Sequence, residues 1–280
     1  MVRGILVRRI AVINQKGGVG KTTTAINLAA SLAYFDQKTL IVDLDPQGNT
    51  TSGLGVDKKA LSLSIFDVLV EERDFSEVMK STPLESLHLV PSNSDLLSVE
   101  WHLAEEGGNG VLRQRVEAYL KRLGESERPA YIFFDCPPSM GPLTLNAVFA
   151  CDAVIIPVQC EYYALEGLTE VLSSCSMIRR HHNPHLCLEG IVLTMADRRL
   201  NLSHQVEEEI RRVYGEYVFK TVINRNVRLS EAPSHGLPII LYDPISHGAG
   251  AYLTLAQEVM ENETKSTRTW PVGHIAPTSG

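Results

Sequence analysis

Near the N-terminus the chain reads Ile10-Ala11-Val12-Ile13-Asn14-Gln15-Lys16-Gly17-Gly18-Val19-Gly20-Lys21-Thr22-Thr23, an apolar run followed by a glycine-rich turn. The apolar run is too short for a helix and has the composition of a strand buried on both faces. Residues 22–35, directly after the turn, have the length and pattern of a helix. A glycine-rich turn between strand and helix lets backbone N–H groups converge on an anion at the positive end of the helix dipole. The sequence therefore predicts a phosphate-binding loop.

Two residues after the glycines make this prediction more specific. Lys21 would neutralise charge on the β- and γ-phosphates of a nucleotide, and Thr22 would place its hydroxyl on Mg²⁺. A plain strand-to-helix turn accounts for the glycines but not for this Lys-Thr pair. We therefore expect nucleotide phosphate and Mg²⁺ at this loop.

Further short apolar runs alternate with helical segments along the chain. The runs lie at residues 40–42, 131–134, 154–156 and 190–193, and the helical segments at 22–35, 111–123, 165–180 and 202–214. Such alternation implies right-handed crossovers and a parallel sheet covered on both sides. We expect an α/β fold with a single doubly wound, mostly parallel sheet over residues 1–262. Residues 57–110 should hold short helices around a strand at 87–90, and residues 263–280 a frayed, disordered tail.

Composition excludes several other classes of protein. The 280 residues are 44% hydrophobic and 21% charged, which suits a globular chain with its own core rather than a disordered one. Asp152 interrupts the apolar residues 147–160, so no membrane span is expected. Arginines occupy the N-terminus where a signal peptide needs an apolar core. Five cysteines without a C-x-x-C pair suggest reduced thiols in a cytoplasm.

The net charge of −7 is distributed unevenly. Residues 175–235 carry nine Lys and Arg against seven Asp and Glu, and eight of those nine are arginines. Solvated helix ends would explain this window, since charge runs usually lie on exposed faces. A basic face on an acidic protein, able to meet phosphates, is the alternative.

The phosphate loop departs in one way from the usual pattern G-x-x-x-x-G-K-[ST]. Gln15 stands where that pattern has glycine, and Lys16 adds a second lysine. The loop resembles the K-G-G-x-G-K-T-T signature of the deviant Walker A ATPases, which have a P-loop NTPase fold. In that family the extra lysine reaches across a dimer interface to the partner's nucleotide, a charge supplied in trans. The resemblance implies a homodimer formed on ATP binding, with catalytic roles for Lys16 and Lys21 and with ATP contacts from Lys16, Gly17, Gly18, Val19, Gly20, Lys21, Thr22 and Thr23.

Two more segments match the same family. Asp43-Leu44-Asp45-Pro46-Gln47-Gly48-Asn49 is similar to its first switch loop, where Asp45 occupies the catalytic position that orients the attacking water. A capped turn is the alternative reading of D-x-D-P alone. Phe133-Phe134-Asp135 is an apolar strand that ends in the Walker B position, so the resemblance implies that Asp135 holds Mg²⁺ through water.

Two later segments narrow the resemblance to ParA-type partition ATPases, specifically the short chromosomal kind often called Soj. They are Cys160-Glu161-Tyr162-Tyr163-Ala164-Leu165-Glu166-Gly167 and residues 226–236, and the likeness covers roughly residues 8–260. The family usually reads Pro-Arg-Asn-Val-Arg where this chain has Asn224-Arg225-Asn226-Val227-Arg228. This stretch lines the adenine in relatives, so Arg225 and Asn226 are expected to bind ATP. The replaced proline leaves open whether Asn224 contacts the base.

The resemblance implies an ATPase of weak intrinsic turnover in chromosome or plasmid segregation. ATP would assemble a sandwich dimer that binds DNA non-specifically, and a ParB-type partner would stimulate hydrolysis. The stretch Thr194-Met195-Ala196-Asp197-Arg198-Arg199 matches the family's T-M-x-D-x-R, which assigns Arg199, together with Arg228, to DNA binding. The protein would be cytoplasmic and associated with the nucleoid.

Four rival classes fit the sequence less well. A nitrogenase-type iron protein needs a cysteine ligand before the Walker B strand, and no cysteine precedes Cys136. A MinD-type ATPase ends in a basic amphipathic helix on membrane, whereas residues 252–260 are followed by few cations, so no membrane partner is expected. A nucleotide-clamped module without turnover would not need Asp45. A plasmid ParA with an N-terminal helix-turn-helix would need room before the first strand near Arg8.

Overall fold

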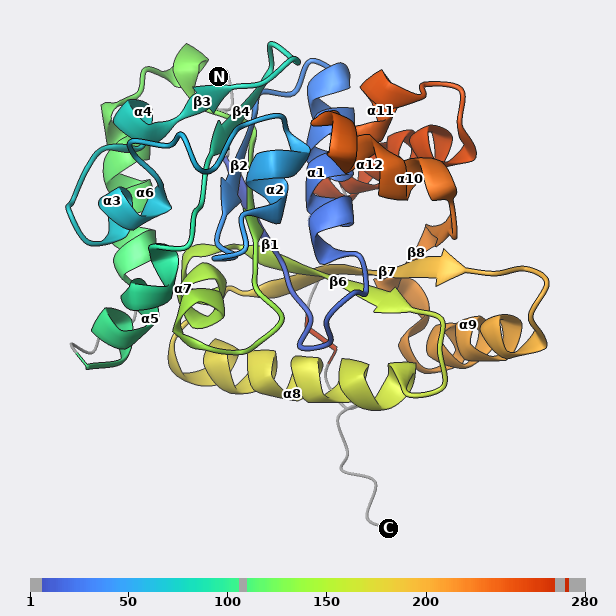
Figure 1. The fold of residues 1–280 in the computed structure, drawn as a ribbon. Coiled ribbons are helices and arrows are strands. Elements are labelled where there is room, and N and C mark those ends of the chain that lie inside the picture. The colour runs from blue at the N-terminus through green and yellow to red at the C-terminus, as the bar shows by residue number, and fades with distance from the viewer. Residues whose placement is uncertain (1–6, 106–109, 265–269, 272–280) are drawn as a thin grey trace.

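Eight strands lie in the order β3-β4-β2-β5-β1-β6-β7-β8 in the computed structural model, which describes residues 7–105, 110–264 and 270–271 (Figure 1). Every neighbouring pair is parallel except β3–β4. The strands are β1 Arg8–Val12, β2 Thr39–Asp43, β3 Lys80–Ser81, β4 Leu87–Val90, β5 Tyr131–Asp135, β6 Ala153–Gln159, β7 Cys187–Ala196 and β8 Val218–Asn224. The predicted doubly wound α/β fold is confirmed.

Helices cover both faces of this sheet (Figure 1). One face carries α1, α2 and α10–α12, and the other carries α3–α9. In chain order they are α1 Lys21–Tyr34, α2 Asn49–Gly53, α3 Ile65–Leu69, α4 Phe75–Val78, α5 Leu96–Glu105, α6 Val111–Arg122, α7 Pro142–Ala150, α8 Ala164–His181, α9 Asn201–Tyr214, α10 Val227–Glu231, α11 Ile239–Tyr242 and α12 His247–Thr264.

Alternate side chains of each central strand enter two separate cores. In β5, Tyr131 and Phe133 pack on the α1 side, whereas Ile132 and Phe134 pack on the α7 side. The same alternation sorts the residues of β1 and β6. A strand buried on both faces is apolar at consecutive positions, which is why these runs were recognisable.

All five cysteines are free thiols, and four of them are buried. Burial raises the pKa of the Cys136, Cys151 and Cys175 thiols, so these side chains behave as small apolar core residues. Within the described ranges no helix combines the length and the apolar character that a membrane crossing requires.

The structure differs from the expected frayed tail at Trp270. Helix α12 continues to Thr264, and the indole of Trp270 is only 4% exposed, in the core beneath α8. Its Nε1 donates a hydrogen bond to Ser176 Oγ at 2.6 Å. Burying a large aromatic ring with its N–H satisfied is favourable enough to hold a terminal segment. Residues 265–269 and 272–280 lie outside the described residues.

Trp270→Ala is therefore expected to lower the free energy of unfolding by about 3 kcal/mol, the usual size for a buried aromatic ring. Trp270→Phe should lose only about 1 kcal/mol, because it keeps most of the apolar area and loses one hydrogen bond. Urea unfolding followed by circular dichroism measures both values. Identical midpoints for the parent chain and Trp270→Ala would show that the indole does not hold this segment to α8.

Candidate functional site

The carboxyl ends of three adjacent strands bring the predicted site residues together. Strand β5 lies between β1 and β2, with Asp135 in register with Val12 on one side and Asp43 on the other. Parallel strands end at the same edge of a sheet, and ligands of such folds bind in the crevice there. The loop after β1, the last residue of β5 and the loop after β2 therefore face one site (Figure 1).

The loop between β1 and α1 has the backbone of an anion cradle. Gly18 and Gly20 have φ values of +75° and +91°, which side chains with a Cβ rarely adopt. A Cβ added to Gly17 or Gly18 would meet nothing within 4 Å, so these two glycines border open space. Thr194 Oγ1 donates to Val19 O at 2.8 Å and fastens the loop to β7. The loop thus leaves open space at Gly17 and Gly18 next to the N-terminus of α1, where the sequence predicts phosphate.

The two lysines of the loop have different surroundings. Lys21, the first residue of α1, is 7% exposed, and its Nζ donates to Lys16 O at 3.1 Å. Burial lowers the pKa of Lys21, and the charge of Asp135 opposes that shift. Lys16 Nζ instead lies 2.8 Å from Glu161 Oε2 at the surface. One cation is therefore buried at the base of the cradle, and the other is held at its rim.

Asp135 has the free oxygen that a divalent cation would need. Its Oδ2 accepts hydrogen bonds from Thr22 Oγ1 at 2.8 Å and Thr50 Oγ1 at 2.7 Å. Its Oδ1 is buried and has no hydrogen-bond partner in the described part of the chain. Burial raises the pKa of Asp135, and the two threonine hydroxyls oppose that shift. Carboxylate and hydroxyl oxygens suit Mg²⁺, so Thr22 and Asp135 fit the ion that the sequence predicts.

Asp45 is positioned by its own turn and by a second carboxylate. It is 8% exposed, and its Oδ1 accepts a hydrogen bond from Gln47 N at 2.9 Å, the capped turn considered above. Its backbone N–H donates to Asp43 Oδ1 at 3.1 Å. Its charge also raises the pKa of Lys21, against the lowering by burial. The carboxylate therefore lies in the electrostatic environment of the phosphate loop, and the turn bond uses only its Oδ1.

Asp43, the fully buried residue that ends β2, belongs to the switch-loop motif but has no role predicted from the sequence. Its Oδ2 accepts from Thr51 N at 2.8 Å and from Thr51 Oγ1 at 2.7 Å, which fixes the start of α2. Burial raises the pKa of Asp43, and the negative charge of Asp135 raises it further. Its position as a carboxylate ending an apolar run, matching that of Asp135, was the available signal.

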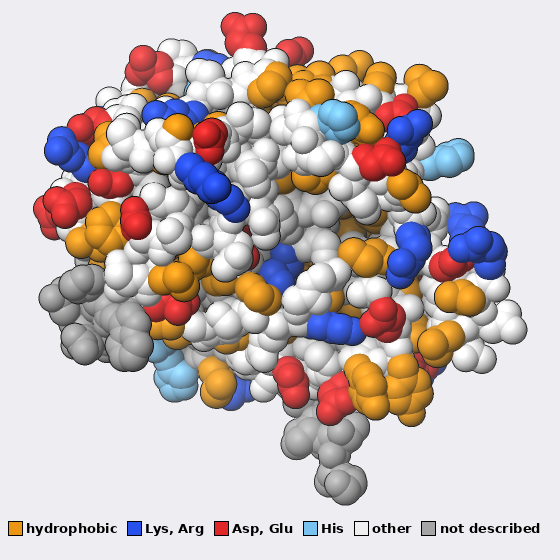
Figure 2. Space-filling model, viewed as in Figure 1, with side chains coloured by type: hydrophobic (Ala, Val, Ile, Leu, Met, Phe, Trp, Pro, Cys, Tyr) orange, Lys and Arg blue, Asp and Glu red, His pale blue; other side chains and the backbone are white. Residues whose placement is uncertain are grey.

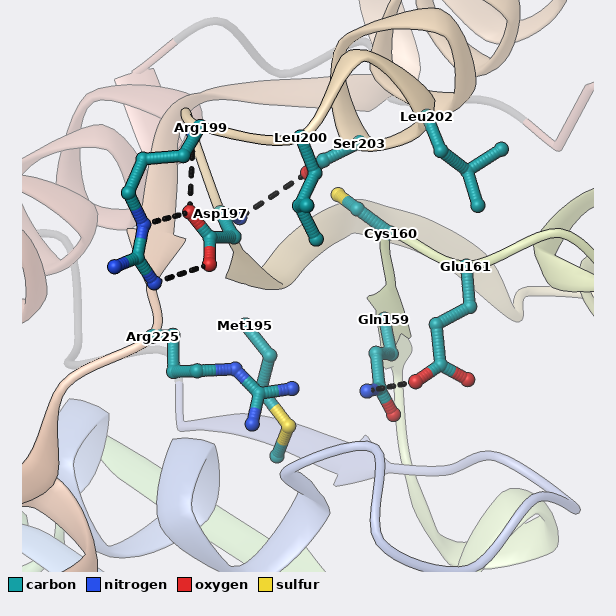
Figure 3. Close-up of a pocket in the computed structure, with 10 residues that line it drawn as sticks. All are labelled: Gln159, Cys160, Glu161, Met195, Asp197, Arg199, Leu200, Leu202, Ser203 and Arg225. Atoms are coloured by element: carbon teal, nitrogen blue, oxygen red, sulfur yellow. Dashed lines mark hydrogen bonds and ion pairs between the residues drawn. The ribbon is translucent and has the colours of Figure 1, made fainter.

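A pocket of about 320 Å³ opens beside the loop, at the ends of β6, β7 and β8 (Figure 3). Arg225 and Met195 both line it, and Met195 has a φ of +50°, a strained value at this rim. The pocket is lined by Gln159, Cys160, Glu161, Met195, Asp197, Arg199, Leu200, Leu202, Ser203 and Arg225. An aromatic base with polar edges fits such a mixed apolar and polar lining.

Of the residues predicted to contact adenine, Arg225 alone lines this pocket. Asn226 instead caps α10, its side chain accepting a hydrogen bond from Arg228 N at 2.8 Å. Asn224 Oδ1 is buried and has no hydrogen-bond partner within the described ranges. An unpaired buried amide oxygen is costly, and a ligand amino group would satisfy it. Asn224 does not line the pocket, however, so the structure adds no contact between Asn224 and a base.

Both arginines assigned to DNA have carboxylate partners in the chain. Arg199 is 85% exposed and makes a bidentate pair with Asp197, at 2.9 and 2.7 Å. Arg228 lies 3.0 Å from Glu231 and 3.3 Å from Asp243. Figure 2 shows Lys and Arg side chains interleaved with Asp and Glu over this side of the molecule. The in-chain ion pairs are what the structure shows, and DNA contacts remain a prediction.

Comparison with known proteins gives close relatives over nearly the whole chain. A family described as an AAA domain matches residues 7–188. The chain is 50% identical over 253 residues to the sporulation initiation inhibitor protein Soj of Bacillus subtilis, covering 90% of this chain and 98% of that protein. It is 48% identical over 267 residues to the chromosome partitioning protein ParA of Myxococcus xanthus, covering 93% of this chain and 91% of that protein.

The fold is similar to that of a solved crystal structure. The crystal structure of cobyrinic acid a,c-diamide synthase from Mycobacterium smegmatis, with bound ADP and magnesium, superposes with a TM-score of 0.79 at 33% identity. The match covers 95% of this chain and 98% of that one.

Proposed function

The chain belongs to the Soj/ParA family of chromosome-partitioning ATPases, and from that membership we propose that it is an ATP-dependent DNA segregation switch. ATP and Mg²⁺ are its cofactors, as for the M. smegmatis structure, whose bound ligands are ADP and magnesium. The observation that carries the proposal is the single edge at which the glycine loop, Lys21, Thr22 and Asp135 meet.

Each residue of this edge has a role that its environment supports. Loop N–H groups and Lys21 would bind the phosphates, and Thr22 and Asp135 would hold Mg²⁺, which neutralises developing charge on the phosphates. Asp45 would orient a water in line with the γ-phosphate, so that the water oxygen bonds to phosphorus as the bond to the ADP oxygen breaks. Lys16 would supply positive charge to the nucleotide of the partner chain. Arg225, which lines the pocket, would contact the adenosine, whereas Asn226 would have to give up its cap on α10 to do so.

The same proposal covers dimerisation, DNA and a partner. The ATP-bound dimer would bind DNA without sequence preference, and a ParB-type protein at its own DNA sites would stimulate hydrolysis and release the dimer. The protein would act in the cytoplasm, in association with the nucleoid; the M. xanthus relative, which is named a chromosome partitioning protein, supports this proposal. Residues 1–262 would form the ATPase domain.

Phosphate release tests the proposed function. The full-length chain should hydrolyse ATP slowly with Mg²⁺ and faster when DNA and a ParB-type protein are both present. Chelation of Mg²⁺ by EDTA should remove both rates. Absence of hydrolysis under all these conditions would leave only a nucleotide-clamped binding module.

Replacing Arg199 or Arg228 by Ala is expected to weaken binding equally across DNA sequences. Phosphate contacts dominate sequence-independent binding, so each change should flatten the log–log salt slope by ~1. Fluorescence anisotropy with two unrelated duplexes at several salt concentrations measures this slope.

Arg113→Ala is the matched control, because Arg113 is also an exposed arginine paired with a carboxylate, at 2.9 Å from Glu117 on α6. Its salt slope should equal that of the parent chain. If Arg199→Ala and Arg228→Ala lower the unfolding midpoint while DNA affinity is intact, the two arginines serve only their in-chain ion pairs.

A further inference from the structure

The lysine that makes this phosphate loop unusual is held by its own chain. Lys16 Nζ and Glu161 Oε2 lie 2.8 Å apart, and the two side chains are 48% and 47% exposed. Lys16 lies in the turn after β1, and Glu161 lies between β6 and α8, 145 residues further along the chain. This ion pair therefore links the nucleotide loop to the segment Cys160–Gly167, of which Cys160 and Glu161 also line the neighbouring pocket.

Other hydrogen bonds hold the Glu161 carboxylate, the acceptor of the ion pair, in place. Gln159 Nε2 donates to Glu161 Oε1, so each carboxylate oxygen has a donor. Glu161 N also donates to Gln159 O at 2.8 Å, in a tight turn at the end of β6. These bonds fix the carboxylate toward the phosphate loop, as Figure 3 shows for its contact with Gln159.

The backbone of Lys16, the donor of the ion pair, is linked through Asn14 to β6, the strand that ends just before Glu161. Lys16 N donates to Asn14 Oδ1 at 3.0 Å, and Asn14 Nδ2 donates to Pro157 O on β6 at 2.7 Å. Lys16 O accepts from Lys21 Nζ at 3.1 Å. A phosphate that draws the Lys21 ammonium to itself would release the Lys16 carbonyl. Nucleotide binding in one chain thus loosens the residue that has to reach the other chain.

We propose that Glu161 is a latch that holds Lys16 in the monomer and sets how readily ATP assembles the dimer. The latch rests on the proposed function, in which Lys16 leaves its own chain for the partner's nucleotide. If Lys16 leaves its own chain as the proposed function requires, its ion pair with Glu161 has to break, so Glu161 and the partner's phosphate compete for one ammonium group. Glu161 is accordingly a positioning residue that acts through Lys16.

The size of the effect follows from the exposure of the pair. Exposed ion pairs shift an equilibrium by about 1.4- to 5-fold. Each dimer releases two such pairs, so removing the latch should lower the dimer dissociation constant by about 2- to 25-fold. The effect should depend on the presence of Lys16.

Glu161→Gln in the full-length chain tests the latch, because it keeps the size of the side chain and removes its charge. Analytical ultracentrifugation with Mg²⁺ and a non-hydrolysable ATP analogue should show a tighter dimer than the parent chain forms. Glu166→Gln is the matched control: it removes the same charge from an exposed glutamate of the same segment that has no ion pair with a described residue. Its dimer should match that of the parent chain.

A second measurement reads the ion pair without any dimer. Acetic anhydride labelling of the nucleotide-free chain, followed by mass spectrometry, should modify Lys16 faster in Glu161→Gln than in the parent, with exposed Lys59 as internal standard. Unchanged labelling of Lys16 would overturn the latch. If the parent chain dimerises with ATP and the Glu161→Gln dimer is no tighter, the latch would be overturned while the proposed function would stand. Absence of an ATP-dependent dimer in both proteins would overturn the proposed function and the latch together.

Discussion

Asp45→Ala is expected to bind ATP, dimerise and remain on DNA while hydrolysing ATP at least about a hundredfold more slowly than the parent chain. The change leaves the glycine loop, Lys21, Thr22 and Lys16 in place, so binding should survive. It removes the carboxylate that would orient the attacking water, and positioning accounts for most of the catalysis in phosphoryl transfer. Single-turnover hydrolysis and DNA residence, measured on one preparation, give both quantities.

The turn that Asp45 caps requires two controls. Asp45→Asn keeps an oxygen that can accept from Gln47 N, so it should hydrolyse as slowly as Asp45→Ala while retaining stability. Asp57→Ala breaks the same kind of turn at an exposed site, where Asp57 Oδ1 accepts from Lys59 N at 3.0 Å, and should hydrolyse normally. If Asp45→Ala merely loses about 1 kcal/mol of stability and hydrolyses at the parent rate, Asp45 only caps the turn.

Lys16→Ala is expected to bind nucleotide as a monomer, to dimerise more weakly with ATP than the parent chain does, and to lose at least about a hundredfold in turnover. Lys21 and the loop N–H groups remain, which preserves monomer binding. A cation supplied across an interface to the transferring phosphoryl group contributes about 10³–10⁵ in rate in related chemistry. Gel filtration with ATP and a fluorescent-ADP titration separate the two effects.

Lys59→Ala controls for the loss of one exposed lysine charge and should behave as the parent chain does. A dimer fraction and ATPase rate equal to those of the parent chain in Lys16→Ala would contradict the trans role. Weaker nucleotide binding by the monomer would show instead that Lys16 acts on the phosphates of its own chain.

The central strands and the phosphate loop could be predicted because their signals are local. Strands β1, β5 and β6 are buried on both faces and therefore apolar at consecutive positions. The loop needs glycines and a Lys-Thr pair within nine residues of sequence, and its backbone φ values follow from those residues.

Strand β8 and helix α7 carry weaker signals and were not predicted. Strand β8 lies at the edge of the sheet, where Lys220 is exposed and the apolar run is broken. Helix α7 is buried around most of its circumference, so its sequence has no amphipathic period. A hydrophobic period in the sequence identifies only elements that have one buried face and one solvent-exposed face.

Side-chain contacts between segments far apart in the sequence could not be predicted from local sequence patterns. Trp270 meets Ser176 across 94 residues, and Lys16 meets Glu161 across 145. Nothing in the residues near Trp270 indicates a partner, because packing that closes long loops is decided by the whole fold. The pairing of Arg199 with Asp197 two residues earlier is local, and the charge pattern allowed for it.

The central claim, that Lys16 of one chain serves the nucleotide of the other, is tested most directly by mixing Lys16→Ala with Asp45→Ala. A mixed dimer has one nucleotide site with its own Asp45 and with Lys16 supplied by the Asp45→Ala chain. At protein concentrations high enough to drive both variants into dimers, random pairing would make half the dimers mixed, with half of their sites complete. Two nearly inactive proteins at equal amounts should then recover up to about a quarter of the parent ATPase rate. If Lys16 served its own chain, no site in the mixture would be complete, and the rate would stay at that of the separate variants.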